Sequence, residues 1–286
     1  MLRQNVEVVV VDYSCPEGSG DYVAKHLPAA RVVKVKGMTE YSHAKSHNAG
    51  ALEASGEILI FCDADTIIAD HAVAWIDENL PPQMYGRIPR ESAEKFADGS
   101  VFSFNQLCGF QVIPTSTFRS LGGFDEVLRG YADGADVDIG QRLQLIGFGK
   151  FDLDIDIIRD VLPHGPVERM QHYADPISKS YAAGLVYNSA KLSLMRLRGH
   201  ANLPLQLRQT LYDAAAKAAD SIGSPDDKVS ISFTAEKTIV GMPLQLGYRS
   251  AVRQVTLTVE LNALDPIDRA EEANTRTGPG GVSAEV

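Results

Sequence analysis

The sequence is poor in cysteine and has no long apolar run. Its three cysteines, Cys15, Cys62 and Cys108, are scattered and lack the spacing of metal ligands. Such cysteines are typical of a reducing compartment, so we expect a cytoplasmic protein, or one that lies peripherally at the inner face of a membrane. No stretch reaches the roughly 18 apolar residues of a membrane helix. The first apolar run follows Glu7 and ends at Asp12, unlike a signal peptide.

Positive charge is also scarce. The chain of 286 residues carries 27 Lys and Arg against 37 Asp and Glu, a formal net charge of −10, which argues against a nucleic-acid partner. A hydrophobic fraction of 44% is ordinary for a globular protein. The length suits one large domain, or one domain with an appendage.

Two carboxylates follow the most apolar run. Residues Ile58–Cys62 come after Gly56 and are followed by Asp63 and Asp65. A short apolar run is typical of a strand buried on both faces, and open α/β sheets bind ligands beyond such strands. If the chain stays extended, the two carboxylates point to one side, roughly 7 Å apart. Two hard oxygen ligands suit Mg²⁺ or Mn²⁺, and the alternative is a strand that ends in a polar turn.

The segments before this strand match a known order of motifs. The apolar strand Val6–Val11 ends at Asp12 and leads into the turn-rich Tyr13–Asp21, and the alanine-rich Ser42–Gly56 follows as a predicted helix. A strand ending Asp-x-Ser, a helix with Asn-x-Gly and a strand ending Asp-x-Asp occur in this order. In this respect the sequence resembles the nucleotide-binding half of the GT-A glycosyltransferases, most closely those of family 2.

A second block of motifs agrees with the same family. Gly-Gly-Phe-Asp-Glu at residues 122–126 precedes the aromatic Tyr131 and the acidic run Asp136–Asp138. This is similar to the family's acceptor-side motif, except that Ala135 stands where the family has Glu. The resemblance covers roughly residues 6–165.

The resemblance implies an α/β fold of the GT-A type, Rossmann-like, with a mixed central sheet and helices on both faces. We expect this domain over residues 1–175, with a nucleotide-sugar half at about 1–68 and an acceptor half at about 100–165.

The remaining residues predict a small C-terminal α+β appendage over 176–264. A helical region at about 176–222 precedes Val229–Ala235 and Val255–Leu261, which both alternate apolar and polar residues and predict a β-hairpin. The polar residues 265–286 predict a disordered tail.

The N-terminus departs from the family. There a first strand and helix precede the strand that is Val6–Val11 here, and that first strand usually lies in the middle of the sheet. Loss of a central strand leaves backbone groups unpaired, which is costly if they are buried. We therefore expect a truncated chain or a late start site; the alternative is that another segment, such as the C-terminal strands, fills the gap.

Other elements follow from periodicity and turn signals. Lone Trp75, near Val73 and Ile76, predicts core packing. The sequence predicts helices at about 19–27, 42–54, 70–79, 114–121 and 136–146; strands at Arg31–Val35, Phe102–Phe104, Phe110–Ile113 and Phe151–Ile158; and an irregular loop over 80–100.

The resemblance implies a divalent metal, Mn²⁺ or Mg²⁺. Asp65 would ligate this ion, and Asp63 would contact it, its waters or the donor ribose. His164, between two prolines, would be the third residue on the metal side; the alternative is an ordinary histidine in a surface loop.

The donor would be held by residues of the same motifs. Asp12 would accept a hydrogen bond from the base or ribose, and the resemblance assigns donor binding also to Ser14, Lys45, Asn48 and Asp63. For Lys45, phosphate contact and a solvated helix face are both open.

His43 and His47 lie four residues apart in a predicted helix and share a face, as in some zinc sites. The Glu of the zinc-protease motif is absent, since residue 44 is Ala, and the sequence offers no third ligand. Contact of His47 with phosphate, or a solvated face, is the simpler interpretation.

The resemblance places the catalytic base at Asp136. Inverting transfer needs a carboxylate within reach of the acceptor hydroxyl. Asp133 would replace the missing Glu if the loop is shifted, and Asp138 would support the helix that follows. The alternative for all three is acidic charge at a helix N-terminus.

Together these features predict metal-dependent transfer of a sugar from a UDP- or GDP-linked donor, with inversion. The acceptor would be a hydroxyl of a glycan, a lipid-linked compound or a small molecule. One alternative is an inactive glycosyltransferase-like protein that binds a nucleotide, a glycan or a protein partner without turnover. Another is a glycoside hydrolase, whose two carboxylates lie about 5–9 Å apart and need no metal.

Overall fold

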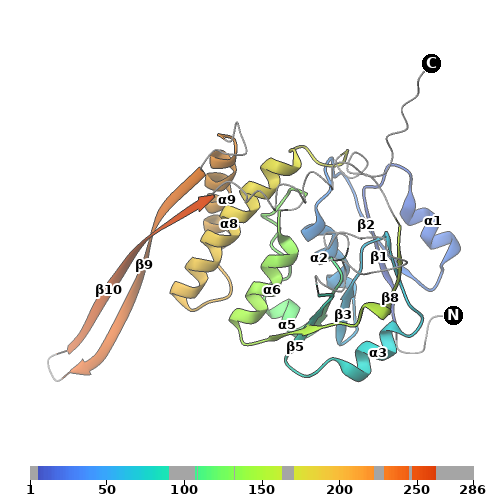
Figure 1. Cartoon of the computed structure of the whole chain (residues 1–286), viewed down its shortest axis with the longest axis horizontal. Helices are drawn as coiled ribbons and strands as arrows, with labels where there is room; N and C mark the ends of the chain where they lie inside the picture. Colours follow the sequence, from blue (N-terminus) through green and yellow to red (C-terminus); the bar gives the residue numbers. More distant parts are fainter. Residues whose placement is uncertain are drawn as a thin grey trace, which may run out of the picture. The chain divides into compact units, whose positions relative to one another are not determined.

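The computed structural model describes residues 6–89, 107, 109–131, 133–162, 171–221, 229–244 and 247–261. These residues form two compact units (Figure 1). The first unit contains the described residues up to Arg129 together with Ala135–Ala174. The second contains Gly130–Gly134 and the described residues from Asp175 onward.

The first unit begins with a parallel β–α–β arrangement. Its strands are paired so that Val11 lies opposite Val33, and Glu7, just before the first strand, accepts hydrogen bonds from the backbone of Ser55 and Gly56. The elements in order are β1 (Val9–Tyr13), α1 (Ser19–His26), β2 (Arg31–Val35), α2 (His43–Glu53) and β3 (Ile58–Phe61). The hydroxyl of Ser42 accepts the backbone N–H of Lys45 and caps α2.

A four-stranded mixed sheet follows, in the order β3-β6-β5-β7. The pairs β3–β6 and β5–β6 are antiparallel and the pair β5–β7 is parallel, so the predicted α/β class with a mixed sheet is confirmed. The new strands are β5 (Met84–Arg87), β6 (Gln111–Pro114) and β7 (Gly149–Asp152), and a separate antiparallel pair is formed by β4 (Thr66–Ile68) and β8 (Ile158–Val161).

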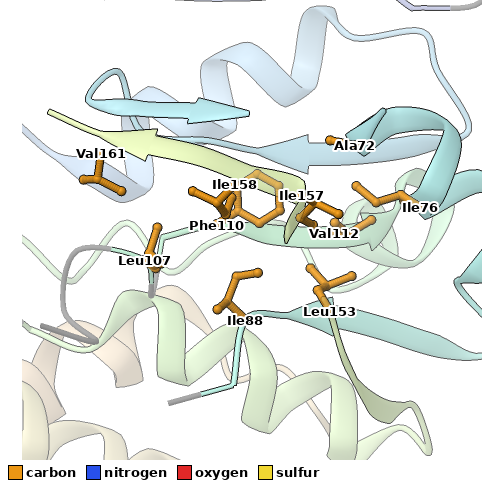
Figure 2. Packing of buried hydrophobic residues seen from close by; sticks show 10 residues of the cluster. All are labelled: Ala72, Ile76, Ile88, Leu107, Phe110, Val112, Leu153, Ile157, Ile158 and Val161. Atoms are coloured by element: carbon orange, nitrogen blue, oxygen red, sulfur yellow. The ribbon is translucent and has the colours of Figure 1, made fainter. Parts of the chain in front are cut away.

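One apolar cluster joins the sheet to the β4–β8 pair and to α3 (Ala72–Asn79) (Figure 2). Val112 of β6 is fully buried there, and Trp75 packs against the cluster, which confirms its predicted core role. Full burial of such a side chain contributes about 1.5–3 kcal/mol. The buried members are Ala72, Ile76, Ile88, Leu107, Phe110, Val112, Leu153, Ile157, Ile158 and Val161.

Two sequence predictions in this unit were wrong. Residues 151–158 form no single strand, because Asp154 accepts the N–H of Asp156 and starts a short 3-10 helix, η2 (Ile155–Ile157), between β7 and β8. The predicted loop over 80–100 contains strand β5, where Tyr85 is buried and Gly86 packs tightly on Leu153. That packing comes from residues distant in sequence, which local patterns do not report. Residues 90–106 lie outside the described residues.

The second unit contains two helices and a long antiparallel hairpin. These are α8 (Ile177–Arg198), α9 (Leu205–Ala219), β9 (Val229–Leu244) and β10 (Gly247–Leu261). The predicted hairpin is confirmed, with Val255 opposite Ala235, and it extends well beyond the predicted strands. Among the described strands, β9 and β10 pair only with each other, and β1 pairs with β2. The C-terminal strands therefore do not extend the β1–β2 pair.

Close contacts of α8 help to hold this unit together. Tyr187 of α8 meets Tyr212 of α9 edge-to-face, with ring centroids 5.5 Å apart. Asn188 donates to the carbonyl of Asp133 at 3.1 Å, and Gly184 lies so close that a Cβ would come within 2.1 Å of that oxygen. Among the helices in the described part of the chain, none has both the length and the apolar character needed to cross a bilayer.

Candidate functional site

Helix α2 lies between the carboxylate predicted for the donor side, Asp63, and the carboxylate predicted as base, Asp136. His47 Nε2 lies 4.0 Å from Asp63 Oδ1, beyond the end of β3. His43 Nε2, one turn earlier, lies 3.5 Å from Asp136 Oδ1 in α6 (Ala135–Leu145). The residue assigned to the donor side and the residue assigned as base are therefore linked by two neighbouring imidazoles.

The aspartates after β3 do not continue the strand. The N–H of Thr66 donates to the carbonyl of Asp63 at 3.0 Å, so the chain turns between them. The extended chain on which the sequence estimate of the carboxylate spacing depended is not present, because a turn comes before β4, which pairs with β8. The backbone at Asp65 is fixed as well, because its carbonyl accepts the N–H of Leu162 at 2.7 Å.

The Asp63 carboxylate lies in a space that a glycine provides. A Cβ on Gly109 would come within 2.3 Å of Asp63 Oδ2, so a larger residue there would displace the carboxylate. About a third of the Asp63 side chain is exposed. The carboxylate therefore packs closely on Gly109 on one side and remains partly exposed.

His43 and His47 stack on each other, with ring centroids 4.0 Å apart. His47 Nδ1 lies 2.9 Å from the carbonyl of His43, which fits an N–H donor there and leaves the Nε2 lone pair toward Asp63. Burial and the neighbouring His43 lower the pKa of His47 to about 3, so this imidazole is neutral at neutral pH. Within the described residues, both ring nitrogens of His43 and Oδ1 of Asp136 are buried without a hydrogen-bond partner.

Near the end of β1, a cavity of 190 Å³ opens. Two cations, Lys45 and Arg129, and two tyrosines, Tyr13 and Tyr41, lie in its wall. The Tyr41 hydroxyl is hydrogen bonded to Ser46 Oγ at 3.0 Å, and burial raises the pKa of Tyr41 to about 12. The remaining lining residues are Gly37, Met38, Thr39, Glu40 and Ser42.

Asp12 and Ser14 hold the loops next to this cavity. The Asp12 carboxylate accepts the N–H groups of Cys15 at 2.8 Å and Gly20 at 3.1 Å. Ser14 adopts a left-handed conformation, with φ 58°, and its hydroxyl donates to Val35 at 2.8 Å and accepts from Met38 at 3.0 Å. Both residues therefore fix the loops after β1 and β2, whatever else they contact.

Asn48 explains why two sequence motifs occur together. Its amide accepts the N–H of Phe124 at 2.8 Å and donates to the Phe124 carbonyl at 3.0 Å and to Glu126 at 2.9 Å. Gly123, with φ 75°, approaches so closely that a Cβ would lie 2.4 Å from Asn48 Oδ1. The Asn-x-Gly helix thus binds the Gly-Gly-Phe-Asp-Glu turn directly.

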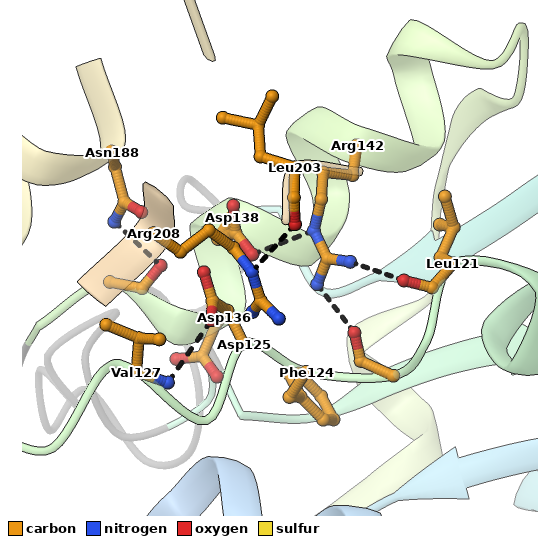
Figure 3. A network of polar contacts seen from close by, with 12 residues as sticks. Leu121, Phe124, Asp125, Val127, Asp136, Asp138, Arg142, Asn188, Leu203 and Arg208 are labelled. Carbon is orange, nitrogen blue, oxygen red and sulfur yellow. Dashed lines mark hydrogen bonds and ion pairs between the residues drawn. The ribbon is translucent and has the colours of Figure 1, made fainter. Parts of the chain in front are cut away.

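The helix that carries Asp136 is held by its other polar residues (Figure 3). Asp138 accepts from buried Arg142 at 2.9 Å, and this guanidinium also donates to the carbonyls of Leu121 and Gly123. Asp138 supports the helix, as the sequence suggested. The backbone carbonyl of Asp136 accepts from Gln111 at 3.0 Å, which fixes the start of α6.

The structure does not bring two further predicted residues to this group. Asp133 belongs to the second unit, where its carboxylate accepts the N–H of Gly130 at 2.9 Å. His164 lies outside the described residues. Sequence reasoning missed Asp63 as a third neighbour of the His43–His47 pair. Only the i, i+4 histidine spacing hinted at such a group.

Residues 1–102 match the family described as Glycosyl transferase family 2. None of the curated proteins matches the sequence. Similar solved structures include the mannosyltransferase PcManGT from Pyrobaculum calidifontis in complex with GDP-Man and Mn²⁺, at 18% identity and a TM-score of 0.45, with 77% of this chain and 67% of that chain covered.

Two others are TarS residues 1–349 from S. aureus and the catalytic domain of Drosophila beta1,4galactosyltransferase 7 in complex with xylobiose. TarS has 17% identity and a TM-score of 0.47, with coverage of 75% of this chain and 62% of that chain, so the present chain spans less than two thirds of it. The Drosophila domain has 12% identity and a TM-score of 0.43, with coverage of 92% and 95%.

Proposed function

We propose that the chain, whose residues 1–102 match glycosyl transferase family 2, transfers a sugar from a UDP- or GDP-linked donor to an acceptor hydroxyl, with inversion. The predicted enzyme class, glycosyltransferase, and the predicted GT-A fold are those of this family. The finer parts of the proposal are the donor, the stereochemistry and the residues that act.

One observation supports the assignment of the residues that act. The donor-side carboxylate Asp63 and the acceptor-side carboxylate Asp136 both face α2, at 4.0 Å from His47 and 3.5 Å from His43. Transfer between two substrates needs both to be held side by side in reacting geometry. A site in which donor-side and acceptor-side carboxylates share one helix surface meets this requirement.

We assign the nucleoside and diphosphate to the cavity beyond β1. Lys45 and Arg129 provide positive charge for phosphate oxygens in a chain whose net charge is −10. Tyr13 offers an aromatic face for the base, Ser14 holds Met38 of the wall, and Asp12 holds the adjoining loop after β1. Asn48 supports this site through its bonds to the turn at Phe124.

The residues after β3 fit a divalent metal. Asp63 and Asp65 are hard oxygen donors, and Gly109 allows the Asp63 carboxylate to take its position. We propose that Asp65, with Asp63 and with His164 from outside the described residues, would hold Mn²⁺ or Mg²⁺. When bound, such an ion neutralises charge on the diphosphate leaving group.

Asp136 acts as base in this proposal. Its Oδ1 is buried and has no hydrogen-bond partner within the described residues, so it can accept the proton of an acceptor hydroxyl. Its position is fixed from behind by Gln111 and by the Asp138–Arg142 pair. The acceptor is a hydroxyl compound, either a glycan, a lipid-linked compound or a small molecule.

Calorimetric titration of UDP and GDP into the full chain, with and without Mn²⁺, tests the donor site. We expect metal-dependent binding of one nucleotide that is lost in Asp65→Ala and retained in Asp77→Ala, an exposed acid on α3. Absence of nucleotide binding by the folded protein would contradict the donor assignment. Binding without any turnover would instead favour the inactive, nucleotide-binding alternative.

A further inference from the structure

We propose that His43, His47 and Asp63 form a binding site for a transition-metal ion of the zinc class, a second ion that would share Asp63 with the donor metal assigned to Asp65. One possible ligand atom from each of these three residues lies within 4.8 Å of the others. No nucleotide is needed for this site, so it can be tested separately from the proposed sugar transfer.

The three residues come from one helix and one turn. His43 and His47 are separated by four residues on α2, and therefore lie on one face of the helix. Asp63 reaches them from the turn after β3, and Gly109 gives its carboxylate the room to approach. The two histidine ligands, carried by one helix, are held more firmly than ligands on loops.

The distances are close to those of a metal site. Zinc–ligand bonds of about 2.0–2.1 Å place tetrahedral ligand atoms roughly 3.4 Å apart. The separation of His47 Nε2 from Asp63 Oδ1 is 4.0 Å, and no pair in the cluster exceeds 4.8 Å. Small side-chain rotations therefore suffice to bring the three atoms onto one ion.

The backbone supports His47 as a ligand. Its Nδ1 lies 2.9 Å from the carbonyl of His43, which fixes the ring and directs Nε2 toward Asp63. Metal-binding histidines commonly donate their second N–H to a carbonyl or carboxylate in this way. Phe61 and Phe124 pack against the ring, at centroid distances of 5.5 and 5.6 Å, and limit access of water.

His43 is hard to explain without a ligand. Its two ring nitrogens are buried and have no hydrogen-bond partner among the described residues. A buried donor without a partner costs about 1–3 kcal/mol, so a purely structural role would favour an apolar aromatic residue here. An ion bound between the two imidazoles and Asp63 would satisfy one of these nitrogens.

The donor set selects the class of metal. Two imidazole nitrogens and one carboxylate oxygen suit zinc and similar first-row ions, whereas Mg²⁺ and Ca²⁺ prefer oxygen alone. Three protein ligands leave a coordination position open, which is typical of catalytic sites and not of structural ones. Asp136 Oδ1 lies 3.5 Å from His43 Nε2.

Cobalt serves as the probe, because Co²⁺ substitutes for zinc and its visible absorption reports coordination. We would titrate Co²⁺ into the chelator-treated full chain without nucleotide, and then displace it with Zn²⁺. We expect one equivalent with a tetrahedral-type spectrum. His43→Phe and His47→Phe should weaken binding at least about 100-fold, since even partners behind a ligand contribute 10–100-fold.

Two variants serve as controls. His71→Phe changes an exposed histidine at the start of α3 and should leave cobalt binding unchanged. Asp65→Ala should change it less than about threefold. Loss of the cobalt spectrum in Asp65→Ala, with retention in both α2 variants, would overturn the proposal and assign the ion to the donor-metal site.

If the α2 variants fail to fold, the unmodified chain still decides the question. X-ray absorption at the zinc edge should show two imidazole ligands on the bound ion. A zinc ion with no imidazole ligand, or no zinc retained after dialysis, would refute the site.

Discussion

The contact between Asn48 and Gly123 predicts a pair of substitutions whose effects do not add. Asn48→Ala removes both amide hydrogen bonds to the backbone of buried Phe124. Each unsatisfied buried group costs about 1–3 kcal/mol, so we expect the free energy of unfolding to fall by about 2–4 kcal/mol. Gly123→Ala should cost about 2–3 kcal/mol, from its left-handed φ of 75° and from displacement of the Asn48 amide.

The double variant should be less destabilised than the sum of the two by about 1–2 kcal/mol. Without the Asn48 amide, the new methyl group no longer meets an atom 2.4 Å away, and the amide bonds can be lost only once. Gly122→Ala is the matched control. Its φ of 74° is similar, but nothing lies within 4 Å of the added Cβ, so its effect should add to that of Asn48→Ala.

Urea unfolding followed by fluorescence measures these effects. Trp75 is the sole tryptophan and packs on the core of the first unit, so its signal reports that unit. Additive costs for the Gly123 pair, or equal coupling for the Gly122 pair, would refute the reasoning. Loss of nucleotide binding in Asn48→Ala without loss of stability would show that Asn48 is a donor ligand and not a support.

Three further predictions concern single residues. Lys45→Ala should weaken nucleotide affinity about tenfold and reduce its dependence on salt, because one phosphate contact is lost; Lys25→Ala, on exposed α1, should not, and calorimetry at two salt concentrations checks this. At pH 8, iodoacetamide should modify Cys15 faster than Cys62, by mass spectrometry. Hydrogen bonds from Ser19 lower the pKa of the Cys15 thiol. For Cys62, removal from water and the neighbouring carboxylates of Asp63 and Asp65 raise the thiol pKa to about 12. Equal rates of modification would contradict this difference. Hydrogen bonds from Ser55 and Gly56 hold the pKa of Glu7 below 4.5, so its stabilisation is present above that pH and is lost as pH falls through the folded-state pKa. Glu7→Gln should therefore lower stability by less than about 1 kcal/mol at pH 7 and by less still in acid, and a constant difference across pH would exclude this cause.

Local sequence signals predicted most of the first unit. Periodicity and turn residues gave α1, β2, α2 and β3 nearly to the residue, since each is determined by neighbours along the chain. The order of the motifs pointed to the family whose model matches residues 1–102. The same signals missed β4 and β5, whose pairing partners lie far away in sequence.

The candidate site could be predicted only in part from the sequence. The types of residue in the motifs pointed to Asp63, Asp65 and Asp136, because carboxylates at strand and helix ends suit metals and proton transfer. The meeting of Asp63 and Asp136 with the α2 histidines is a tertiary contact that no spacing encodes. Nor could spacing show that Asn48 is engaged by the turn at Phe124, or that Asp12 holds the start of α1.

Release of nucleotide from UDP- and GDP-sugars, with Mn²⁺ and a panel of saccharide acceptors, tests the central claim most directly. We predict release that depends on acceptor and metal, and a fall of about 10²–10⁴-fold in turnover for Asp136→Asn with donor affinity unchanged. That range corresponds to about 2.7–5.4 kcal/mol in the transition state. Full turnover in Asp136→Asn would contradict the assignment of Asp136 as the base. Tight nucleotide binding without release from any donor would contradict the proposal that the chain is an enzyme.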